Sequence, residues 1–234
     1  MTPSLQSLPA GYRALVLGAS GAIGGAVLAA LQADPRCGAA LGLSRADGLD
    51  LTDDHALATL FAPLQAQAPF HLVFIATGVL NTGRSPEKRL ADLDPATMAQ
   101  VFAVNTIGPA LLVKHAHALL PTQGRSLLAV LSARVGSIGD NRKGGWTSYR
   151  ASKAALNMVL KTAAIEVARR RPGAVLAALH PGTVRSALST PIIGDAEAHS
   201  PEQAARHLLA VLDGLPAEGA SGGFWAWDGQ AIVW

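Results

Sequence analysis

The chain has 234 residues, 50% of them hydrophobic and only 15% charged, so it is long and apolar enough to bury one full core. Its net charge of +3 comes from 19 basic and 16 acidic residues, and its longest basic run, Arg169-Arg170-Arg171, favours a solvated helix end over a nucleic-acid site. The single cysteine, Cys37, excludes an intrachain disulfide, and neither a signal peptide nor a long uninterrupted apolar run is present. We therefore expect a soluble, cytoplasmic protein with no nucleic-acid or membrane partner.

A glycine-rich turn between an apolar strand and a helix is the first recognisable feature. Residues 13–17 are predicted as a buried strand, residues 18–25 as the turn and residues 26–32 as a helix. Glycines let the backbone approach a dinucleotide pyrophosphate closely, and the helix N-terminus supplies amide donors and a favourable dipole. The spacing departs from the standard G-x-G-x-x-G, so a purely structural tight turn is the alternative.

The second predicted strand, residues 41–43, ends in Ser44 and Arg45. Dinucleotide folds that bind NAD usually carry an acidic residue here, whereas an arginine accommodates the 2′-phosphate of NADP. The hydroxyl and the guanidinium favour NADP(H) over NAD(H). The alternative is that Arg45 is an ordinary exposed loop residue.

Strands and helices alternate along the rest of the chain. A short third strand is predicted to end at Asp50–Asp53, where Asp53 caps a helix over residues 54–65. Further strands are predicted at residues 71–75, 126–131 and 175–179, with strand pieces at 223–227 and 231–234 around an Asp228-Gly229 turn. Further helices are predicted at residues 95–120, broken near Gly108-Pro109, at 148–171 and at 201–212, with loops at 81–94 and 187–200.

This alternation predicts an α/β fold. We expect one domain over residues 1–234, with a Rossmann-type, doubly wound, mostly parallel seven-stranded sheet covered by helices on both faces. Ligands in such folds bind at the carboxyl ends of the strands, where the glycine turn, Ala76-Thr77-Gly78, Ser132 and Pro181-Gly182 are expected to converge.

Tyr149 and Lys153 are four residues apart in a predicted helix, so both side chains project from the same face. A phenol has a pKa of about 10, and a nearby ammonium stabilises its phenolate. Bringing the pKa close to 7 requires about 4 kcal/mol, to which the positive ring of an oxidised nicotinamide cofactor would contribute. Taken alone, the pattern also fits a surface pair. His115 and His117 lie on different faces of their helix, so no metal site is expected.

The assembled motifs resemble those of a known family. They include Gly136–Asn141, Gly144-Gly145-Trp146 and Tyr149–Asn157, in addition to the glycine turn. By these motifs and their order, the chain resembles the classical short-chain dehydrogenases/reductases over nearly all of its length. Within that family it is most similar to the carbonyl-reductase-like branch that includes the C-factor and sniffer proteins.

The resemblance implies an NAD(P)(H)-dependent oxidoreductase that interconverts a carbonyl and an alcohol, with NADPH as preferred cofactor and a small aldehyde or ketone as substrate. Tyr149 would be the general acid/base, Lys153 would lower its pKa and hold the nicotinamide ribose, and Asn105 would hold a water that connects Lys153 to solvent. With the residues discussed above, the expected cofactor-binding set is Gly18, Ser20, Ile23, Gly24, Ser44, Arg45, Asp50, Leu51, Ala76, Thr77, Gly78, Tyr149, Lys153, Pro181, Gly182, Val184 and Ser186. A homodimer or homotetramer formed through helices 96–120 and 148–170 is also implied.

Two departures from the family pattern concern the cofactor site and are expected to be tolerated. The glycine turn has Ala22 where the family usually has glycine, and Leu17 replaces the usual threonine. The family's Asn-Asn-Ala-Gly turn has become Ile75-Ala76-Thr77-Gly78.

Two further departures concern the substrate side. The substrate-orienting serine is expected at Ala133, and the nearest hydroxyls are those of Ser132 and Ser137. Because adjacent strand residues face opposite ways, Ser132 can serve as the fourth catalytic residue only if its strand has already ended; strand-end capping is the alternative. The loop from Gly139 to Tyr149 is also longer than usual. Ala133 and the C-factor resemblance keep open a regulatory or signalling protein that binds cofactor with weak or no catalysis.

Overall fold

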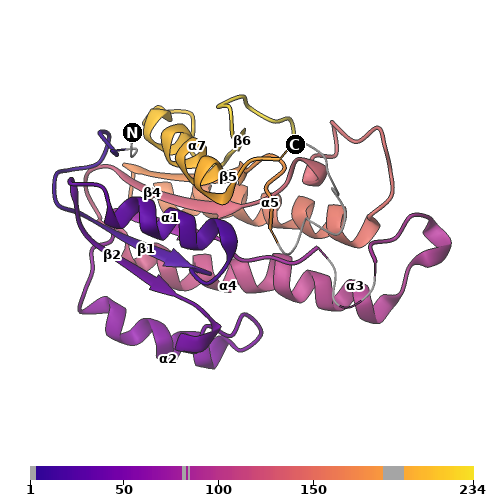
Figure 1. The fold of residues 1–234 in the computed structure, drawn as a ribbon. Coiled ribbons are helices and arrows are strands. Elements are labelled where there is room, and N and C mark those ends of the chain that lie inside the picture. Colours follow the sequence, from indigo (N-terminus) through magenta and orange to yellow (C-terminus); the bar gives the residue numbers. More distant parts are fainter. Residues whose placement is uncertain (1–3, 81–82, 84, 187–197) are drawn as a thin grey trace.

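Six parallel strands form one sheet in the computed structural model, which describes residues 4–80, 83, 85–186 and 198–234 (Figure 1). The strands are β1 (Tyr12–Leu17), β2 (Cys37–Leu43), β3 (Leu72–Ile75), β4 (Ser126–Leu131), β5 (Ala174–His180) and β6 (Gly223–Ala226). Their order across the sheet is β2-β1-β3-β4-β5-β6. The order reverses beside β1, so the carboxyl ends of β1 and β3 flank the crevice in which such sheets bind ligands.

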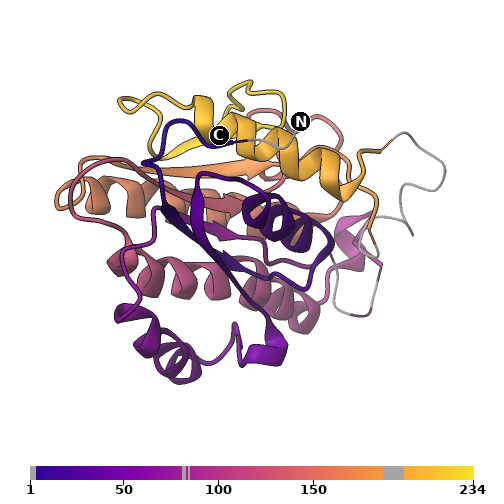
Figure 2. The same ribbon diagram turned by 60° about the vertical axis from the view of Figure 1, so that its left-hand side comes forward.

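Helices cover both faces of the sheet. The helices α1 (Ala22–Gln32) and α7 (Pro201–Gly214) pack side by side on one face, as Figure 2 shows. The helices α2 (Asp54–Gln65), α4 (Gly108–Ala116) and α5 (Thr147–Ala168) cover the other face. The helix α3 (Pro95–Phe102) continues α4 in the direction of the N-terminus.

The strand sequences explain why both faces are covered. In β4, Leu128 and Val130 pack into the core beneath α4 and α5, whereas Leu127 and Ala129 pack into the core beneath α1 and α7. Successive strand residues point to opposite faces, so a strand that is apolar throughout needs a cover on each side. The α/β architecture predicted from the sequence is confirmed.

The sheet has six strands in the described part of the chain, not the seven that the sequence predicted. At Asp50–Asp53 the chain forms a turn, because the Asp50 carboxylate accepts hydrogen bonds from Thr52 N (2.9 Å) and Thr52 Oγ1 (2.7 Å). A side chain that satisfies a nearby backbone N–H in this way competes with a strand ladder. The helix that follows begins at Asp54 as predicted, with Asp53 accepting from the N–H groups of His55 and Ala56.

The C-terminal residues 231–234 contribute only an isolated antiparallel bridge between Trp225 and Ala231. The predicted loop at residues 187–200 lies outside the described residues over most of its length, from 187 to 197. Near the end of this loop, His199 forms a parallel bridge with Val184.

The helical segment Pro95–Leu119 is irregular one turn earlier than predicted. Residues Ala103–Ile107 form a π-helical turn, and α4 begins at Gly108 with Pro109 in its first turn. A proline donates no N–H, so the regular hydrogen-bond ladder is interrupted just before it. Short π-turns are frequent at functional sites, and this one contains Asn105.

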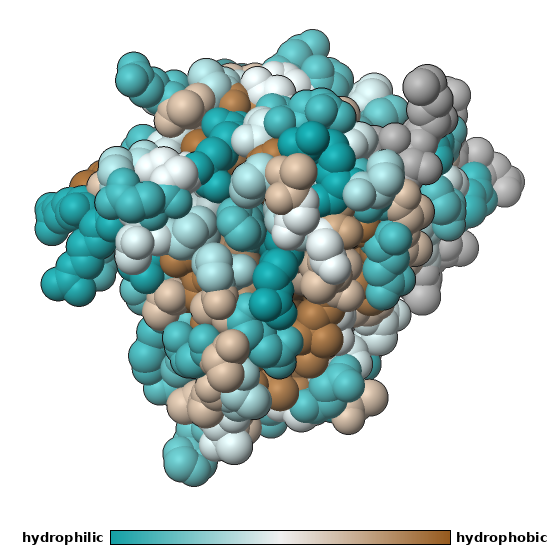
Figure 3. All heavy atoms as spheres, turned by 90° about the vertical axis from the view of Figure 1, so that its left-hand side faces the viewer, coloured by the Kyte–Doolittle hydropathy of each residue, from teal (hydrophilic) through white to brown (hydrophobic). Residues whose placement is uncertain are grey.

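The same segment, Pro95–Leu119, is the one described helix that is long and apolar enough to cross a membrane. Core helices pass this test too, and Leu112, Val113 and Ala116 of the segment are buried against the sheet and α5. Figure 3, which views the left-hand side of Figure 1, shows mostly hydrophilic residues with apolar ones in small separate areas. Apolar surface of that extent is ordinary for a folded chain.

Candidate active site

The glycine turn after β1 is packed so tightly that side chains do not fit. Gly18 has a φ of +91°, and a Cβ there would lie 2.9 Å from the carbonyl oxygen of Ala76. A Cβ on Gly24 would lie 2.2 Å from the carbonyl oxygen of Gly18, so α1 can approach the turn only because this residue is glycine. Ala22, which replaces the family's glycine, is exposed, and its methyl group therefore has room.

The N-terminus of α1 has no side-chain cap and no acidic residue in its first turn. The first N–H groups of a helix lack partners inside the helix. An uncapped N-terminus beside a tight glycine turn suits an anionic ligand such as a pyrophosphate.

A cavity of about 650 Å³ lies against the glycine turn at the carboxyl ends of β1, β2 and β3. Many of the residues predicted to bind cofactor line it: Gly18, Ser20, Ser44, Arg45, Asp50, Leu51, Ala76, Thr77 and Gly78. The remaining lining residues were not among those predicted to bind cofactor, although Gly21 belongs to the predicted glycine turn: they are Gly21, Gly48, Leu49, Thr52, Val79 and Val104. The size of the cavity and its position at the crevice fit a dinucleotide.

Ser44 and Arg45, which both line this cavity, differ in whether their side chains already have partners inside the protein. The hydroxyl and the backbone N–H of Ser44 both donate to one carboxylate oxygen of Asp47, at 2.8 Å and 2.9 Å, so the predicted hydroxyl donor is used within the turn. The guanidinium of Arg45 is exposed at the edge of the cavity and forms no ion pair with any described carboxylate. Arg45 is thus available to a phosphate.

Thr77 is a further residue that bears on whether a dinucleotide fits this cavity. Its Oγ1 is buried and has no hydrogen-bond partner among the described residues. Buried polar atoms normally have a partner, so an orphaned hydroxyl on a cavity wall is where a ligand or an ordered water is expected. The donors and spaces of this cavity therefore fit a dinucleotide.

Lys153 and Asn105 meet around Gly78. A Cβ built on Gly78 would lie 3.2 Å from Lys153 Nζ and 3.3 Å from Asn105 Oδ1. Lys153 is 3% exposed, and its ammonium donates to the carbonyl oxygen of Leu131 at 3.0 Å. Gly78 also lines the 650 Å³ cavity, so the Lys153 ammonium lies close to a residue of the cavity wall, although Lys153 itself does not line the cavity.

Asn105 is fully buried and joins two elements. Val79 N donates to its Oδ1 at 2.8 Å, while its Nδ2 donates to the Val79 carbonyl oxygen at 2.7 Å and to Ser152 Oγ at 3.2 Å. These bonds tie the turn after β3 to α5. Asn105 and Lys153 both lie against Gly78, and the expected role of Asn105 in holding a water stays a prediction.

Burial has opposite effects on the two members of the predicted catalytic pair. It raises the pKa of Tyr149 to about 12 and lowers the pKa of Lys153 to about 8. We expected Lys153 to lower the pKa of Tyr149. In the protein alone, desolvation is the larger effect, because it penalises the charged form of each group. Tyr149 is therefore a neutral phenol at neutral pH.

The two candidate orienting serines both have partners inside the protein. Ser132 lies one residue beyond the end of β4, and its Oγ donates to Asn157 Oδ1 at 2.6 Å. Asn157 shares the face of α5 that carries Tyr149 and Lys153, since the three are spaced by four residues. Ser137 Oγ instead accepts from Asp140 N at 3.0 Å, within its own loop. Ser132 thus faces the helix that carries the pair.

The predicted residues at the other end of the site follow β5 and lie outside the 650 Å³ cavity. Gly182 has a φ of +77°, and a Cβ there would lie 2.9 Å from the Trp227 ring, so the turn requires glycine. Pro181 and Ser186 belong to the same turn, and Val184 is buried in it. Ile23, the second residue of α1, does not line the cavity either.

The sequence analysis did not include His180, the last residue of β5, among the site residues. Its Nδ1 is buried without a partner among the described residues, and burial lowers its pKa to about 4. Its only sequence signal is its place directly before Pro181.

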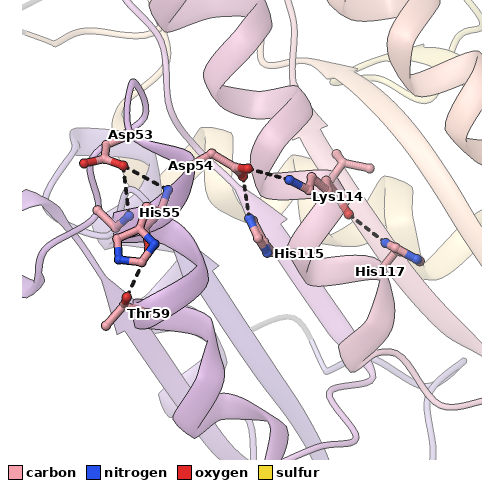
Figure 4. A network of polar contacts seen from close by, with 9 residues as sticks. Asp53, Asp54, His55, Thr59, Lys114, His115 and His117 are labelled. Atoms are coloured by element: carbon pink, nitrogen blue, oxygen red, sulfur yellow. Dashed lines mark hydrogen bonds and ion pairs between the residues drawn. The ribbon is translucent and has the colours of Figure 1, made fainter.

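The other histidines considered in the sequence lie in a separate network (Figure 4). Asp54 of α2 accepts from Lys114 Nζ at 2.6 Å and pairs with His115 Nε2 at 2.8 Å, whereas His117 Nδ1 contacts the Val113 carbonyl oxygen at 3.2 Å. No group of three or more potential metal ligands occurs among the described residues. The network joins α2 to α4.

Comparisons with known proteins agree with this geometry. A family model described as enoyl-(acyl carrier protein) reductase matches residues 29–213. The 1-hydroxy-2-glutathionyl-2-methyl-3-butene dehydrogenase of Rhodococcus sp. is 32% identical over 209 residues, which cover 89% of this chain and 88% of that protein. The C-signal protein of Myxococcus xanthus is 36% identical over 148 residues, 62% of this chain and 83% of that protein.

Two solved structures share the fold over nearly the whole chain. The carbonyl reductase Sniffer of D. melanogaster superposes with a TM-score of 0.80 at 20% identity and covers 96% of this chain and 99% of its own. The NADPH-bound carbonyl reductase from chicken fatty liver superposes with a TM-score of 0.79 at 24% identity, with coverage of 97% and 100%. By the family match and the glycine-turn architecture, the chain belongs to the short-chain dehydrogenase/reductase family of oxidoreductases.

Proposed function

We propose that the protein is an NADPH-dependent reductase of a small aldehyde or ketone, with Tyr149 as general acid and Lys153 as its partner. The observation that carries the proposal is the position of Gly78. It lines the 650 Å³ cavity and lies against both Lys153 Nζ and Asn105 Oδ1. A dinucleotide that fills the cavity from Arg45 to Gly78 therefore reaches the helix face that carries Tyr149.

The preference for NADPH rests on Arg45, an exposed guanidinium on the cavity wall with no described carboxylate paired to it. The chicken carbonyl reductase of the same fold was solved with NADPH, which is in keeping with this proposal. NADH is the less favoured cofactor, because no acidic side chain ends β2 to bind a ribose diol.

The chemistry divides between cofactor and protein. The bound dinucleotide supplies the hydride that reaches the carbonyl carbon of the substrate. Tyr149 donates the proton to the carbonyl oxygen, and a pKa raised to about 12 keeps it in the protonated form that reduction requires. Lys153, held by the Leu131 carbonyl, places a positive charge beside the cofactor cavity, and Asn105 fixes the turn that separates the two.

A second function remains a candidate because of the serine position. Ala133 replaces the expected orienting hydroxyl, and Ser132 and Ser137 both bond to other protein groups. Weak or absent catalysis in a cofactor-binding regulatory protein is the alternative, in keeping with the similarity to the Myxococcus C-signal protein.

The proposal includes a homodimer or homotetramer formed through the helical segments 96–120 and 148–170. Three apolar side chains on this part of the molecule are exposed: Ile107 (53%), Met158 (66%) and Ile165 (56%). A second copy of the chain would remove them from water. Light scattering of the purified protein measures the assembly directly, and a monomer at all concentrations would reject it.

The test of the reductase is NADPH oxidation, followed by absorbance, against aldehydes, diketones and quinones, with NADH in parallel. Tyr149→Phe should lower kcat by about 10²-fold or more, because it removes the proton donor, while the Kd for NADPH stays nearly unchanged. Tyr12→Phe is the matched control, since the Tyr12 hydroxyl is bonded to Asp34 at 2.8 Å, away from the cavity.

Activity largely retained in Tyr149→Phe would reject the mechanism. Tight NADPH binding with no turnover by the wild-type protein across the panel would instead favour the regulatory alternative.

A further inference from the structure

We propose that Glu87 is a positioning residue for Tyr149: its carboxylate caps helix α5 from a neighbouring loop and holds the first turn of that helix in place. This inference rests on the proposed role of Tyr149. Glu87 lies in the loop that follows β3, a region that the sequence indicates only as polar and rich in turns.

The helix α5 has no cap of its own. It begins at Thr147, and the preceding residue, Trp146, has a left-handed backbone (φ 54°) and forms no capping hydrogen bond with its side chain. The first turn also contains no acidic residue. The first N–H groups of a helix need acceptors from elsewhere, and a helix without them frays. Tyr149 lies in this turn, so fraying would move the proposed proton donor.

Glu87 supplies the missing acceptors from outside the helix. Ser148 N donates to Glu87 Oε2 at 3.3 Å, and Ser148 Oγ donates to Glu87 Oε1. Trp146 N donates to the backbone carbonyl oxygen of Glu87 at 2.6 Å. Glu87 is 8% exposed and Ser148 is 2% exposed, so these bonds are shielded from water. A carboxylate at this place also complements the positive end of the helix dipole.

Glu87 contacts two residues that lie just before Tyr149 in the chain, Ser148 and Trp146. Ser148 directly precedes Tyr149, and the Trp146 ring packs edge-on against the Tyr149 ring, with centroids 6.4 Å apart and planes at 67°. The next residue, Arg150, closes the loop from the other side, since its Nε donates to the carbonyl oxygens of Gly144 (3.2 Å) and Gly145 (2.8 Å). Glu87 therefore holds the residue before Tyr149 and the backbone of Trp146, whose ring lies beside the Tyr149 ring.

The test combines kinetics with amide hydrogen exchange of full-length protein. Glu87→Ala should lower kcat by about 10- to 100-fold, because a misplacement of about 1 Å costs that much, while KM and the Kd for NADPH change less than about threefold. Glu87→Gln keeps an oxygen acceptor for Ser148 and should recover most of kcat; it also serves if Glu87→Ala does not fold. Exchange of the first-turn amides of α5, measured by mass spectrometry, should rise in Glu87→Ala and much less in Glu87→Gln.

Two further variants separate positioning from loop stability. Asp92→Ala perturbs the same loop by removing the exposed ion pair between Arg89 Nη2 and Asp92 Oδ1, which are 2.7 Å apart. The hydrogen bonds of the Asp92 carboxylate come from Arg89 and none comes from α5, so this variant should leave kcat and α5 exchange unchanged. Ser148→Ala should lower kcat in the wild-type background and add nothing in Glu87→Ala, because the two residues act through one contact.

The inference is overturned if Glu87→Ala keeps wild-type kcat whatever its exchange, if kcat falls while α5 exchange stays unchanged, or if Asp92→Ala reproduces the loss. Absence of turnover in the wild-type protein would reject the reductase proposal itself. In that case the exchange data alone decide whether Glu87 holds the first turn of α5, and unchanged exchange in Glu87→Ala rejects it.

Discussion

Replacing Lys153 by methionine should change how the stability of the protein depends on pH. Lys153 is 3% exposed, and burial lowers its pKa from the ordinary 10.5 to about 8. Below pH 8 the folded protein holds a buried ammonium, at a cost of roughly 3 kcal/mol relative to the unfolded chain. Between pH 8 and 10.5 the unfolded chain binds more protons than the folded one, so this cost is relieved as pH rises.

Methionine has a similar length and no charge, so Lys153→Met should remove this pH dependence. Below pH 8 the variant gains stability because it no longer buries an ammonium. This gain is offset in part by loss of the hydrogen bond to the Leu131 carbonyl, which is worth about 1–3 kcal/mol. The loss of this hydrogen bond has little effect on the slope of stability against pH. The stability difference between variant and wild type should therefore shift by about 3 kcal/mol, in favour of wild type, from pH 7 to about pH 10.5.

Urea unfolding followed by circular dichroism at several pH values measures this difference. Lys143→Met is the matched control, because Lys143 is exposed in the loop before α5, and its stability curve should run parallel to the wild-type curve. A Lys153→Met curve that is parallel to wild type across the same pH range would show that the buried ammonium is not destabilised, and would refute the reasoning.

Arg45→Asp should move the ratio of NADPH to NADH binding constants toward NADH by about tenfold or more, as measured by fluorescence titration, because it replaces a phosphate partner with a ribose partner; an unchanged ratio would reject the role of Arg45. Ser132→Ala should lower kcat/KM more than Ser137→Ala, because only Ser132 faces α5, and equal effects in steady-state kinetics would exclude Ser132 as the orienting hydroxyl. His180→Phe should flatten the loss of stability between pH 6.5 and about 4, where charging the buried imidazole costs roughly 3 kcal/mol. Above pH 6.5 the imidazole is neutral in both the folded and the unfolded chain, so charging does not change the stability there. A His180→Phe variant that loses stability toward pH 4 as steeply as wild type in urea unfolding would contradict this prediction.

Much of the site could be predicted because its signals are local. The apolar run of β1, the glycine turn and the start of α1 are consecutive in the chain, and each depends on short-range preferences: burial of a strand, space for a backbone approach and an open helix N-terminus. The four-residue spacing of Tyr149 and Lys153 likewise places both on one helix face whatever surrounds them. These features, with the alternation of strands and helices, indicated the fold and the cofactor crevice.

Contacts between distant segments and the balance between burial and charge were decided by the tertiary structure. The sequence suggested a strand at Asp50, but the Asp50 carboxylate bonds to Thr52 and forms a turn. It suggested that Lys153 lowers the pKa of Tyr149, but folding buries both groups, and desolvation depends on everything packed around them. The Glu87–Ser148 contact joins residues 61 positions apart, and no local pattern announces a helix cap supplied by another loop. Local preferences are written in neighbouring residues, whereas water exclusion and long-range acceptors exist only once the chain has folded.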